Sequence, residues 1–328
     1  MYLPFSAIRD ARLYLSRYLP VTRLLPAPSL GRLTGSKVYL KLESELPTGS
    51  FKPRGALYAL SLNLQRRNLT EVVASSTGNH GAAVAYAAKL LQVPATIFLP
   101  ENPNPVKRAR IAELGAKIVE QGSGDLAEAF EQASAYAQTE DIYFLNDATD
   151  PDLPAGPATI ACEILEQLPE ADALYVPMGD TALIRGVAAA AKHLSPRVKI
   201  VGVQAERAPA YYLSWKQGLA VRTDDCDTIA DGLATRTPDI NNVRAIRELV
   251  DDMRLVSEEQ MLTAIRHLLF EEHLVVEPAG AATTAALLQA PEPSARNVVA
   301  LVTGNNISPE VLRSAVCSNG VDATLGSR

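Results

Sequence analysis

The stretch Lys41–Ala56, KLESELPTGSFKPRGA, places one lysine in an unusual setting. A Pro-Thr-Gly turn signal at 47–49 is followed by a helical pattern whose first residue is expected to be Pro53. Lys52 therefore lies at the mouth of a helix, between a phenylalanine and a proline, and not on a polar helix face. Taken alone, the pattern also fits an exposed lysine at a helix start, so its meaning depends on the remaining motifs.

The composition predicts a cytoplasmic protein of enzyme size. The 328 residues suffice for two domains, and 47% of them are hydrophobic. A formal net charge of −6 argues against nucleic acid as a partner, because a phosphate backbone attracts clustered Lys and Arg. We expect no membrane association and no signal peptide, since no apolar run is long enough for either. The three cysteines are far apart and predict neither a zinc site nor a disulfide framework.

Short β-rich runs alternate with amphipathic helical stretches along most of the chain. This alternation predicts an α/β protein of two domains, each a mostly parallel, twisted sheet covered by helices. Residues 147–156 are rich in Pro, Asp and Gly, which is typical of a surface connection. We expect residues 1–69 and 151–328 to form a large domain that binds the cofactor, and residues 70–150 a small mobile one. The expected strands are 37–43, 71–76, 95–100, 117–121, 142–145, 173–178, 199–205 and 297–304.

Three of these strands run into glycine-containing turns. The turns are SSTGNHG at 75–81, GDTALIRG at 179–186 and TGNN at 303–306. Ligands of parallel α/β sheets gather at the carboxyl ends of the strands, so the turns are expected to line one site. Two of them open helices, whose free backbone N–H groups can bind an anion. No GxGxxG motif follows the first strand, so a dinucleotide site is not indicated.

Six segments, taken in order, resemble the tryptophan-synthase-β-like family of fold type II pyridoxal-phosphate enzymes. The serine/threonine dehydratase and serine racemase branch is the most similar. The resemblance covers nearly the whole chain, from Val21 to Asn306, and implies pyridoxal 5'-phosphate (PLP) as cofactor, a small amino acid as substrate and a homodimer. The segments are SFKPRGA (50–56), SSTGNHG (75–81), GDTALIRG (179–186), TIADGLA (228–234), EPAGA (277–281) and TGNN (303–306).

The resemblance implies a role for the opening lysine. Lys52 would bind the cofactor as an imine, with Phe51 helping to keep water out, and lysine suits this task because its pKa falls readily on burial. Thr303 would face the pyridine nitrogen of the cofactor. A neutral hydroxyl there makes the ring a weaker electron sink, which favours prompt loss of a β leaving group. Glu277 would lie near the ring, although it also fits an acid at the start of a helix.

The loop SSTGNHG would bind the substrate carboxylate through its hydroxyl and backbone N–H groups. Its residues Ser76, Thr77, Asn79 and His80 also fit a helix N-cap cluster, and a lone histidine is more often structural than a base. Asn79 would in addition hydrogen-bond the ring oxygen of the cofactor. Thr77 stands where racemases of the family carry a serine that donates the second proton. Because its β-branch restricts its rotamers, we expect elimination to dominate over racemisation.

The segment GDTAL aligns with the glycine-rich phosphate cup of the family, where close dehydratases carry four consecutive glycines. The segment still offers backbone N–H groups after this change, so it can still bind a phosphate. The alternative interpretation is an ordinary helix N-terminus without a ligand. Asp180 does not fit a phosphate site, because its carboxylate would repel a phosphate dianion. We expect it to turn away, toward Arg185. The cup would be formed by Gly179, Asp180, Thr181, Ala182 and Leu183.

No bound metal is expected. Racemase-like relatives bind a divalent cation through a Glu, a backbone carbonyl and an Asp. Glu206 and the carbonyl of Ala210 match the first two, but Tyr212 stands at the position of the second carboxylate, and hard cations prefer charged oxygen ligands. The acidic segment 224–227 is interpreted as a solvated loop.

These observations predict a PLP-dependent ammonia-lyase. A β-hydroxy amino acid of the L-threonine or L-serine type, or 3-hydroxyaspartate, would be converted to a 2-keto acid and ammonia, with Lys52 taking the α-proton. A racemase of similar amino acids is the first alternative. The others are a β-replacement synthase, against which the sequence GNH argues, and a non-catalytic PLP-binding protein, suggested by the altered phosphate cup. Intact Lys52, Asn79 and Thr303 argue against the last.

Overall fold

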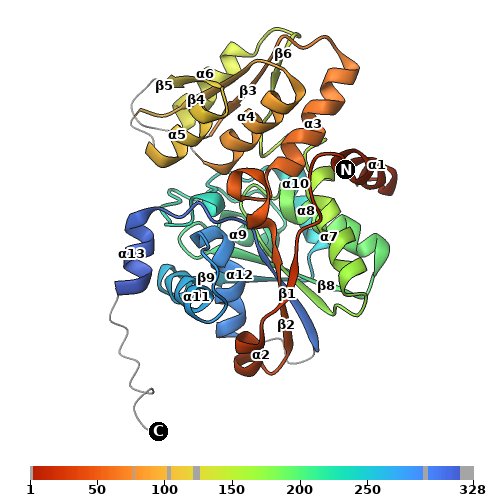
Figure 1. Cartoon of the computed structure of the whole chain (residues 1–328), viewed down its shortest axis with the longest axis vertical. Coiled ribbons are helices and arrows are strands. Elements are labelled where there is room, and N and C mark those ends of the chain that lie inside the picture. The colour runs from red at the N-terminus through yellow and green to blue at the C-terminus, as the bar shows by residue number, and fades with distance from the viewer. Residues whose placement is uncertain (1–2, 77, 102–104, 121–125, 291–294, 318–328) are drawn as a thin grey trace.

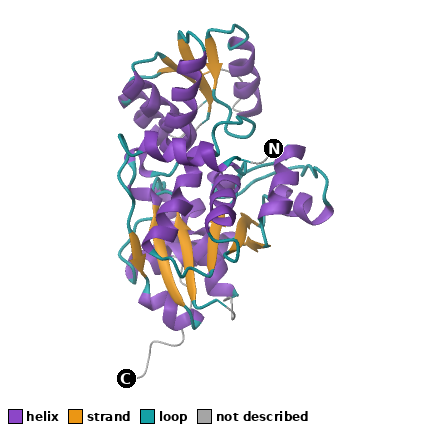
Figure 2. Ribbon diagram, turned by 90° about the vertical axis from the view of Figure 1, so that its right-hand side faces the viewer, coloured by secondary structure: helices purple, strands orange, loops and turns teal. Residues whose placement is uncertain are grey.

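The computed structural model describes residues 3–76, 78–101, 105–120, 126–290 and 295–317. Two sheets, each with its own helices, are arranged one above the other along the long axis of the molecule (Figures 1 and 2). No helix within the described ranges combines the length and the apolar character needed to cross a bilayer.

The larger sheet has the strand order β1-β2-β10-β7-β8-β9. β1 pairs antiparallel with β2, and all other neighbours are parallel. Every residue of β7 is buried, as expected for a central parallel strand with helices on both faces. The strands are β1 (Leu24–Pro26), β2 (Lys37–Leu42), β7 (Ala173–Pro177), β8 (Lys199–Ala205), β9 (Asp252–Val256) and β10 (Asn297–Val302).

The smaller sheet is entirely parallel, with the order β5-β4-β3-β6. Its strands are β3 (Glu71–Ser75), β4 (Ala95–Leu99), β5 (Lys117–Glu120) and β6 (Ile142–Phe144). α4 (Asn79–Leu91) and α5 (Pro105–Glu113) follow β3 and β4, and α6 (Leu126–Tyr136) follows β5. β3, β4 and β5 thus each lead into a helix that returns the chain for the next parallel strand of this sheet.

The two faces of the larger sheet form separate apolar layers, as the alternation along β10 shows. On one face, Val298, Ala300 and Val302 pack in a buried cluster with α2 (Pro28–Thr34), α11 (Glu258–Phe270) and α12 (Pro278–Gln289). On the other, Val299 and Leu301 pack in a second cluster with α7 (Ala155–Gln167), α8 (Ala182–Leu194) and α10 (Ile240–Leu249). The remaining helices of the described ranges are α1 (Phe5–Leu15), α3 (Pro53–Arg66), α9 (Ala210–Gln217) and α13 (Pro309–Cys317).

The predicted α/β class with mostly parallel sheets is confirmed, and each expected strand is present. β1 and β9 were not predicted. β1 has only three residues and ends at Pro26, and β9 is an edge strand that carries Asp252 and Arg254, so neither has a clear apolar run. The division at residues 69/70 and 150/151 stays a prediction. α3, on the large side of the first boundary, contacts both α4 and α7.

A buried ionic cluster fixes the first turn of α3. Arg54 Nε and Nη2 donate to Glu43 over 2.7 and 2.9 Å, and Arg54 Nη1 donates to Glu163 over 2.6 Å. Lys41 Nζ donates to the same Glu163 over 2.7 Å. None of the four side chains is more than 7% exposed. Burial alone would lower the pKa of Arg54, but Glu43 and Glu163 outweigh it and raise that pKa. The cluster therefore ties α3 to β2 and α7 as a charged unit.

We expect Glu163→Gln to destabilise the fold by about 3–5 kcal/mol, because it leaves Lys41 and Arg54 buried with too little negative charge. Glu166→Gln, on the same helix α7, provides the matched control. Glu166 pairs with Arg12 at an exposed position, so its loss is expected to cost about 1 kcal/mol or less. Urea unfolding of both variants measures the difference. Equal losses would contradict the structural importance of the buried cluster.

Candidate active site

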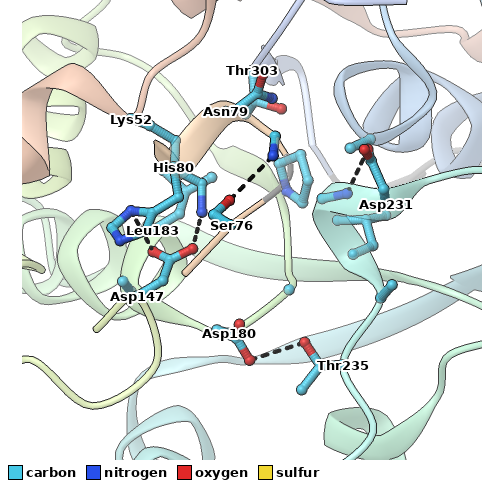
Figure 3. Close-up of a pocket in the computed structure, with 18 of the residues that line it drawn as sticks. Lys52, Ser76, Asn79, His80, Asp147, Asp180, Leu183, Asp231, Thr235 and Thr303 are labelled. Carbon is cyan, nitrogen blue, oxygen red and sulfur yellow. Dashed lines mark hydrogen bonds and ion pairs between the residues drawn. The ribbon is translucent and has the colours of Figure 1, made fainter. Parts of the chain in front are cut away.

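A pocket lies at the carboxyl ends of strands from both sheets (Figure 3). It encloses about 1010 Å³ of space, part of which is open to solvent. The segments that follow β3, β6, β7 and β10 all contribute to it, as expected for parallel sheets. Its lining is Phe51, Lys52, Ser75, Ser76, Gly78, Asn79, His80, Asp147, Pro177, Gly179, Asp180, Thr181, Ala182, Leu183, Asp231, Gly232, Leu233, Ala234, Thr235, Glu277, Ala279 and Thr303.

Lys52 is the N-cap residue of α3, and Pro53 begins the helix as predicted. The backbone before it is anchored to the end of β10: Ser50 forms a β-bridge with Gly304, and Phe51 N donates to the carbonyl of Thr303 over 3.0 Å. This anchor leaves Lys52 directed into the pocket, where its side chain is 17% exposed and Nζ contacts Asp147 (Figure 3). The opening lysine is therefore an inward-facing amine and not a solvated one.

Asp147 lies between Lys52 and His80. Its Oδ2 accepts from Lys52 Nζ, and its Oδ1 lies 3.7 Å from His80 Nδ1. Burial would raise the pKa of Asp147, but the Lys52 ammonium in contact with it outweighs that effect and holds the pKa below its ordinary value. Burial also lowers the pKa of His80, whose Nε2 lies 2.9 Å from the carbonyl of Leu145. At neutral pH this site therefore holds a carboxylate beside a neutral imidazole.

Asn79 belongs to a short chain of hydrogen bonds across the pocket floor. Asn79 Nδ2 donates to Glu277 Oε1 over 2.7 Å, and Asn306 Nδ2 donates to Asn79 Oδ1 over 2.7 Å. Gly304 leaves room for this arrangement, because a Cβ there would lie 1.9 Å from Glu277 Oε1. Thr303 is 4% exposed and lines the same floor. The structure thus brings Asn79, Glu277 and Thr303 to one side of Lys52.

The start of α8 is the candidate anion-binding cradle of this pocket. Thr181, its N-cap, adopts the left-handed conformation at φ 70°, which strains a β-branched residue and turns the chain tightly into the helix. A Cβ on Gly179 would lie 2.3 Å from the carbonyl oxygen of Gly232, so only a glycine allows the two loops to lie this close together. The first backbone N–H groups of α8 lack helical acceptors, and such groups bind anions.

Asp180 lines this cradle and corrects one expectation. Its carboxylate accepts from Thr235 Oγ1 over 3.0 Å, whereas Arg185 donates to Thr181 Oγ1 and to the carbonyl of Ala148. Asp180 therefore does not turn away toward Arg185. Burial, with a smaller effect of the nearby Asp147, raises the pKa of Asp180 to about 6.

Every predicted site residue within the described ranges lines the pocket, and Thr77 lies outside those ranges. The sequence analysis did not identify Asp147 as a site residue, because residues 147–156 suggested only a surface connection. The signal that could have identified it is its position soon after β6, since residues that follow parallel strands tend to line the ligand site. It also gave no role to 231–235, although TIADGLA had been noticed as a motif. No cluster of three or more His, Cys, Asp or Glu side chains suited to a metal occurs in the described part of the chain.

Comparisons with known proteins agree with this geometry. The family model of pyridoxal-phosphate dependent enzymes matches residues 15–304. An L-threonine ammonia-lyase from Thermotoga maritima is 35% identical over 93% of this chain and 76% of its own length. Human serine racemase is 33% identical over 93% of this chain and 92% of its own length. The crystal structure of a T.th. threonine deaminase superposes with a TM-score of 0.86 and 33% identity, covering 93% of this chain and 99% of the other.

The chain belongs to the pyridoxal-phosphate-dependent enzymes, of the fold type II class, and its cofactor is PLP. The pocket suits this cofactor. Lys52 would supply an amine for its aldehyde, and the first turn of α8 would supply donors for its phosphate. Ser75 Oγ is buried at the pocket wall and has no hydrogen-bond partner among the described residues, which leaves a polar atom for a ligand. Among the described residues of the cradle, Asp180 is the only one whose side chain can carry a negative charge, and that charge would repel a phosphate.

We expect PLP affinity to fall as the pH rises through about 6 and above, because Asp180 then becomes a carboxylate beside the phosphate. Asp180→Asn keeps the shape without the charge, so it should bind PLP roughly tenfold more tightly than the parent at pH 8 and about equally at pH 5. Equilibrium titration with PLP at both pH values measures this. Asp231→Asn, also in the pocket lining, is the control. The same gain in both variants, or at both pH values, would contradict a specific effect of Asp180.

Proposed function

We propose that this protein is a PLP-dependent ammonia-lyase that removes water from a β-hydroxy amino acid and yields a 2-keto acid and ammonia. L-Threonine and L-serine are the favoured substrates, and 3-hydroxyaspartate belongs to the same class. One observation carries the proposal. The Lys52 amine enters a pocket that also contains the loop of Ser76 and Asn79 and the start of α8, so an amino acid and the cofactor can meet at one amine.

PLP, when bound, supplies an electron sink that weakens the bonds at the substrate α-carbon. Lys52 provides the base at that carbon, because its amine is freed when the substrate amine takes its place. The start of α4 binds the substrate carboxylate: Ser76 Oγ accepts from Gly78 N over 3.2 Å, which leaves its own hydrogen to donate. Asn79 is oriented by Glu277 and Asn306 on either side. These residues hold the α-carbon near the amine that takes its proton.

Thr303 favours elimination over racemisation. A hydroxyl, unlike a carboxylate, does not hold a proton on the pyridine nitrogen, so negative charge at the α-carbon is weakly stabilised. A leaving group at the β-carbon then departs before a proton can return to the opposite face. Racemisation is the second candidate function, supported by the similarity to serine racemase.

We expect the PLP-loaded protein to form pyruvate from L-serine and 2-oxobutyrate from L-threonine faster than it forms D-serine from L-serine. Lys52→Ala should lower keto-acid formation by roughly 10³-fold or more, because both the cofactor attachment and the base are lost. Lys52→Arg is the matched variant, since it keeps the positive charge but provides no amine for the cofactor. Keto-acid assays and chiral chromatography follow both products. D-Serine appearing before pyruvate would replace the lyase by a racemase, and full activity in either variant would exclude Lys52.

The remaining expectations concern the whole molecule. We propose that the protein is a cytoplasmic homodimer, as the family resemblance implies. α11 and α13, which contact each other, expose Phe270 and Val316, apolar side chains of the kind that subunit interfaces cover. We also propose that residues 70–150 form a small domain that closes over the bound substrate, because the carboxylate loop lies on it while the cradle of α8 follows the larger sheet.

A further inference from the structure

Asp147 has no assigned task in the scheme above. Its side chain lines the pocket and is 22% exposed. Charged and titratable groups reach it from several elements: Lys52 from the start of α3, His80 from α4, Asp180 from the loop after β7 and Arg185 from α8. Lys52 is in direct contact with it, and the proton that Lys52 takes from the substrate must leave that amine before the next turnover.

His80 provides Asp147 with a second partner. A carbonyl only accepts hydrogen bonds, so the 2.9 Å contact with Leu145 places a hydrogen on His80 Nε2. Burial lowers the pKa of His80 and keeps the ring neutral, so its Nδ1 carries a lone pair. That lone pair faces Asp147 Oδ1 at 3.7 Å. As a carboxylate, Asp147 accepts a hydrogen bond from the Lys52 ammonium. As a protonated carboxyl group, it has the His80 Nδ1 lone pair nearby as an acceptor.

The other acids of the pocket are differently engaged. Asp180 accepts from Thr235, Asp231 accepts from the backbone N–H of Gly232, and Glu277 accepts from Asn79. Among the described residues, no other acidic side chain forms a hydrogen bond with Lys52. The carboxyl group of Asp147 is therefore the one that can exchange a proton directly with the amine that acts at the α-carbon.

We propose that Asp147 is the general acid that protonates the departing β-hydroxyl. This inference rests on the proposed elimination. The Lys52 amine takes the α-proton, and the resulting ammonium passes a proton to the Asp147 carboxylate. The Asp147 carboxyl then donates that proton to the β-oxygen as the carbon–oxygen bond breaks, the electron pair of that bond leaves with the oxygen, and water departs. The electrons of the former C–H bond become the Cα–Cβ double bond, and Lys52 and Asp147 return to their starting forms.

The decisive comparison uses two substrates that differ only in whether the leaving group needs a proton. L-Serine must lose its hydroxyl as water, whereas β-chloro-L-alanine loses chloride without protonation. Both still require Lys52 to take the α-proton. Asp147→Asn is therefore expected to lower kcat/KM for pyruvate formation from L-serine by roughly 10²-fold or more, and from β-chloro-L-alanine by less than about tenfold. Asp147→Glu, which retains an acid, should recover part of the serine activity.

Asp152→Asn is the charge-matched control. It removes a carboxylate five residues further along, where Asp152 pairs with Arg66 outside the pocket lining, and should leave both rates within a few-fold of the parent. A second readout needs no turnover. In the PLP-loaded, substrate-free protein, Asp147→Asn should shift to lower pH the transition at which the cofactor absorbance changes, because the Asp147 carboxylate beside the nitrogen of Lys52 favours the protonated form of that nitrogen.

The outcomes separate cleanly. Equal losses with both substrates would mean that Asp147 only positions Lys52, and unchanged rates would show that it takes no part in the reaction. Either result overturns the inference, as does a spectral transition at the same pH in Asp147→Asn and in the parent. In each of these cases a parent protein active on L-serine leaves the proposed lyase intact. A parent that forms pyruvate from neither substrate overturns the proposed function and the inference together.

Discussion

The ion pairs of Arg54 with Glu43 and Glu163 are the constraint on which the site depends. Arg54 lies two residues after Lys52, so whatever fixes its guanidinium also fixes the first turn of α3 and the lysine before it. A guanidinium this deeply buried persists only where carboxylates compensate it from several sides. Gly156 in α7 reinforces this, because a Cβ there would lie 2.2 Å from the carbonyl oxygen of Arg54. Helix α3 can therefore neither rotate nor lift from α7 without breaking charged contacts.

The pocket above this cluster is unusually acidic for a site that holds a phosphate cofactor. Among the described residues, its lining includes Asp147, Asp180, Asp231 and Glu277 but only one cation, Lys52. A phosphate bound at the start of α8 would rely on the backbone N–H groups there, since no arginine or lysine lines the cradle in the described part of the chain. The two acids nearest Lys52 differ in their pKa. Contact with the Lys52 ammonium holds the pKa of Asp147 below its ordinary value, whereas burial without a cation in contact raises the pKa of Asp180 to about 6.

Family likeness and chain-specific detail thus contribute different parts of the mechanism. The lysine, the asparagine and the threonine belong to the motifs that resemble the family, and we propose that they provide a base, an oriented cofactor ring and a weak electron sink. Asp147 is not part of any of the six recognised motifs. Its contact with Lys52 adds a path by which the proton removed from one carbon can serve the leaving group on the next.

The amino-acid sequence by itself determined the α/β class, the parallel strands and the motifs around Lys52, Asn79 and Thr303, because apolar runs, helix starts and glycine turns are local signals. It did not reveal β1 or β9, whose few residues pair only because a neighbouring strand presents a free edge. Nor did it indicate that Asp180 bonds Thr235 or that Asp147 meets Lys52. Those contacts join residues 55 and 95 positions apart, and only the folding of two sheets around one pocket decides which distant charges become neighbours.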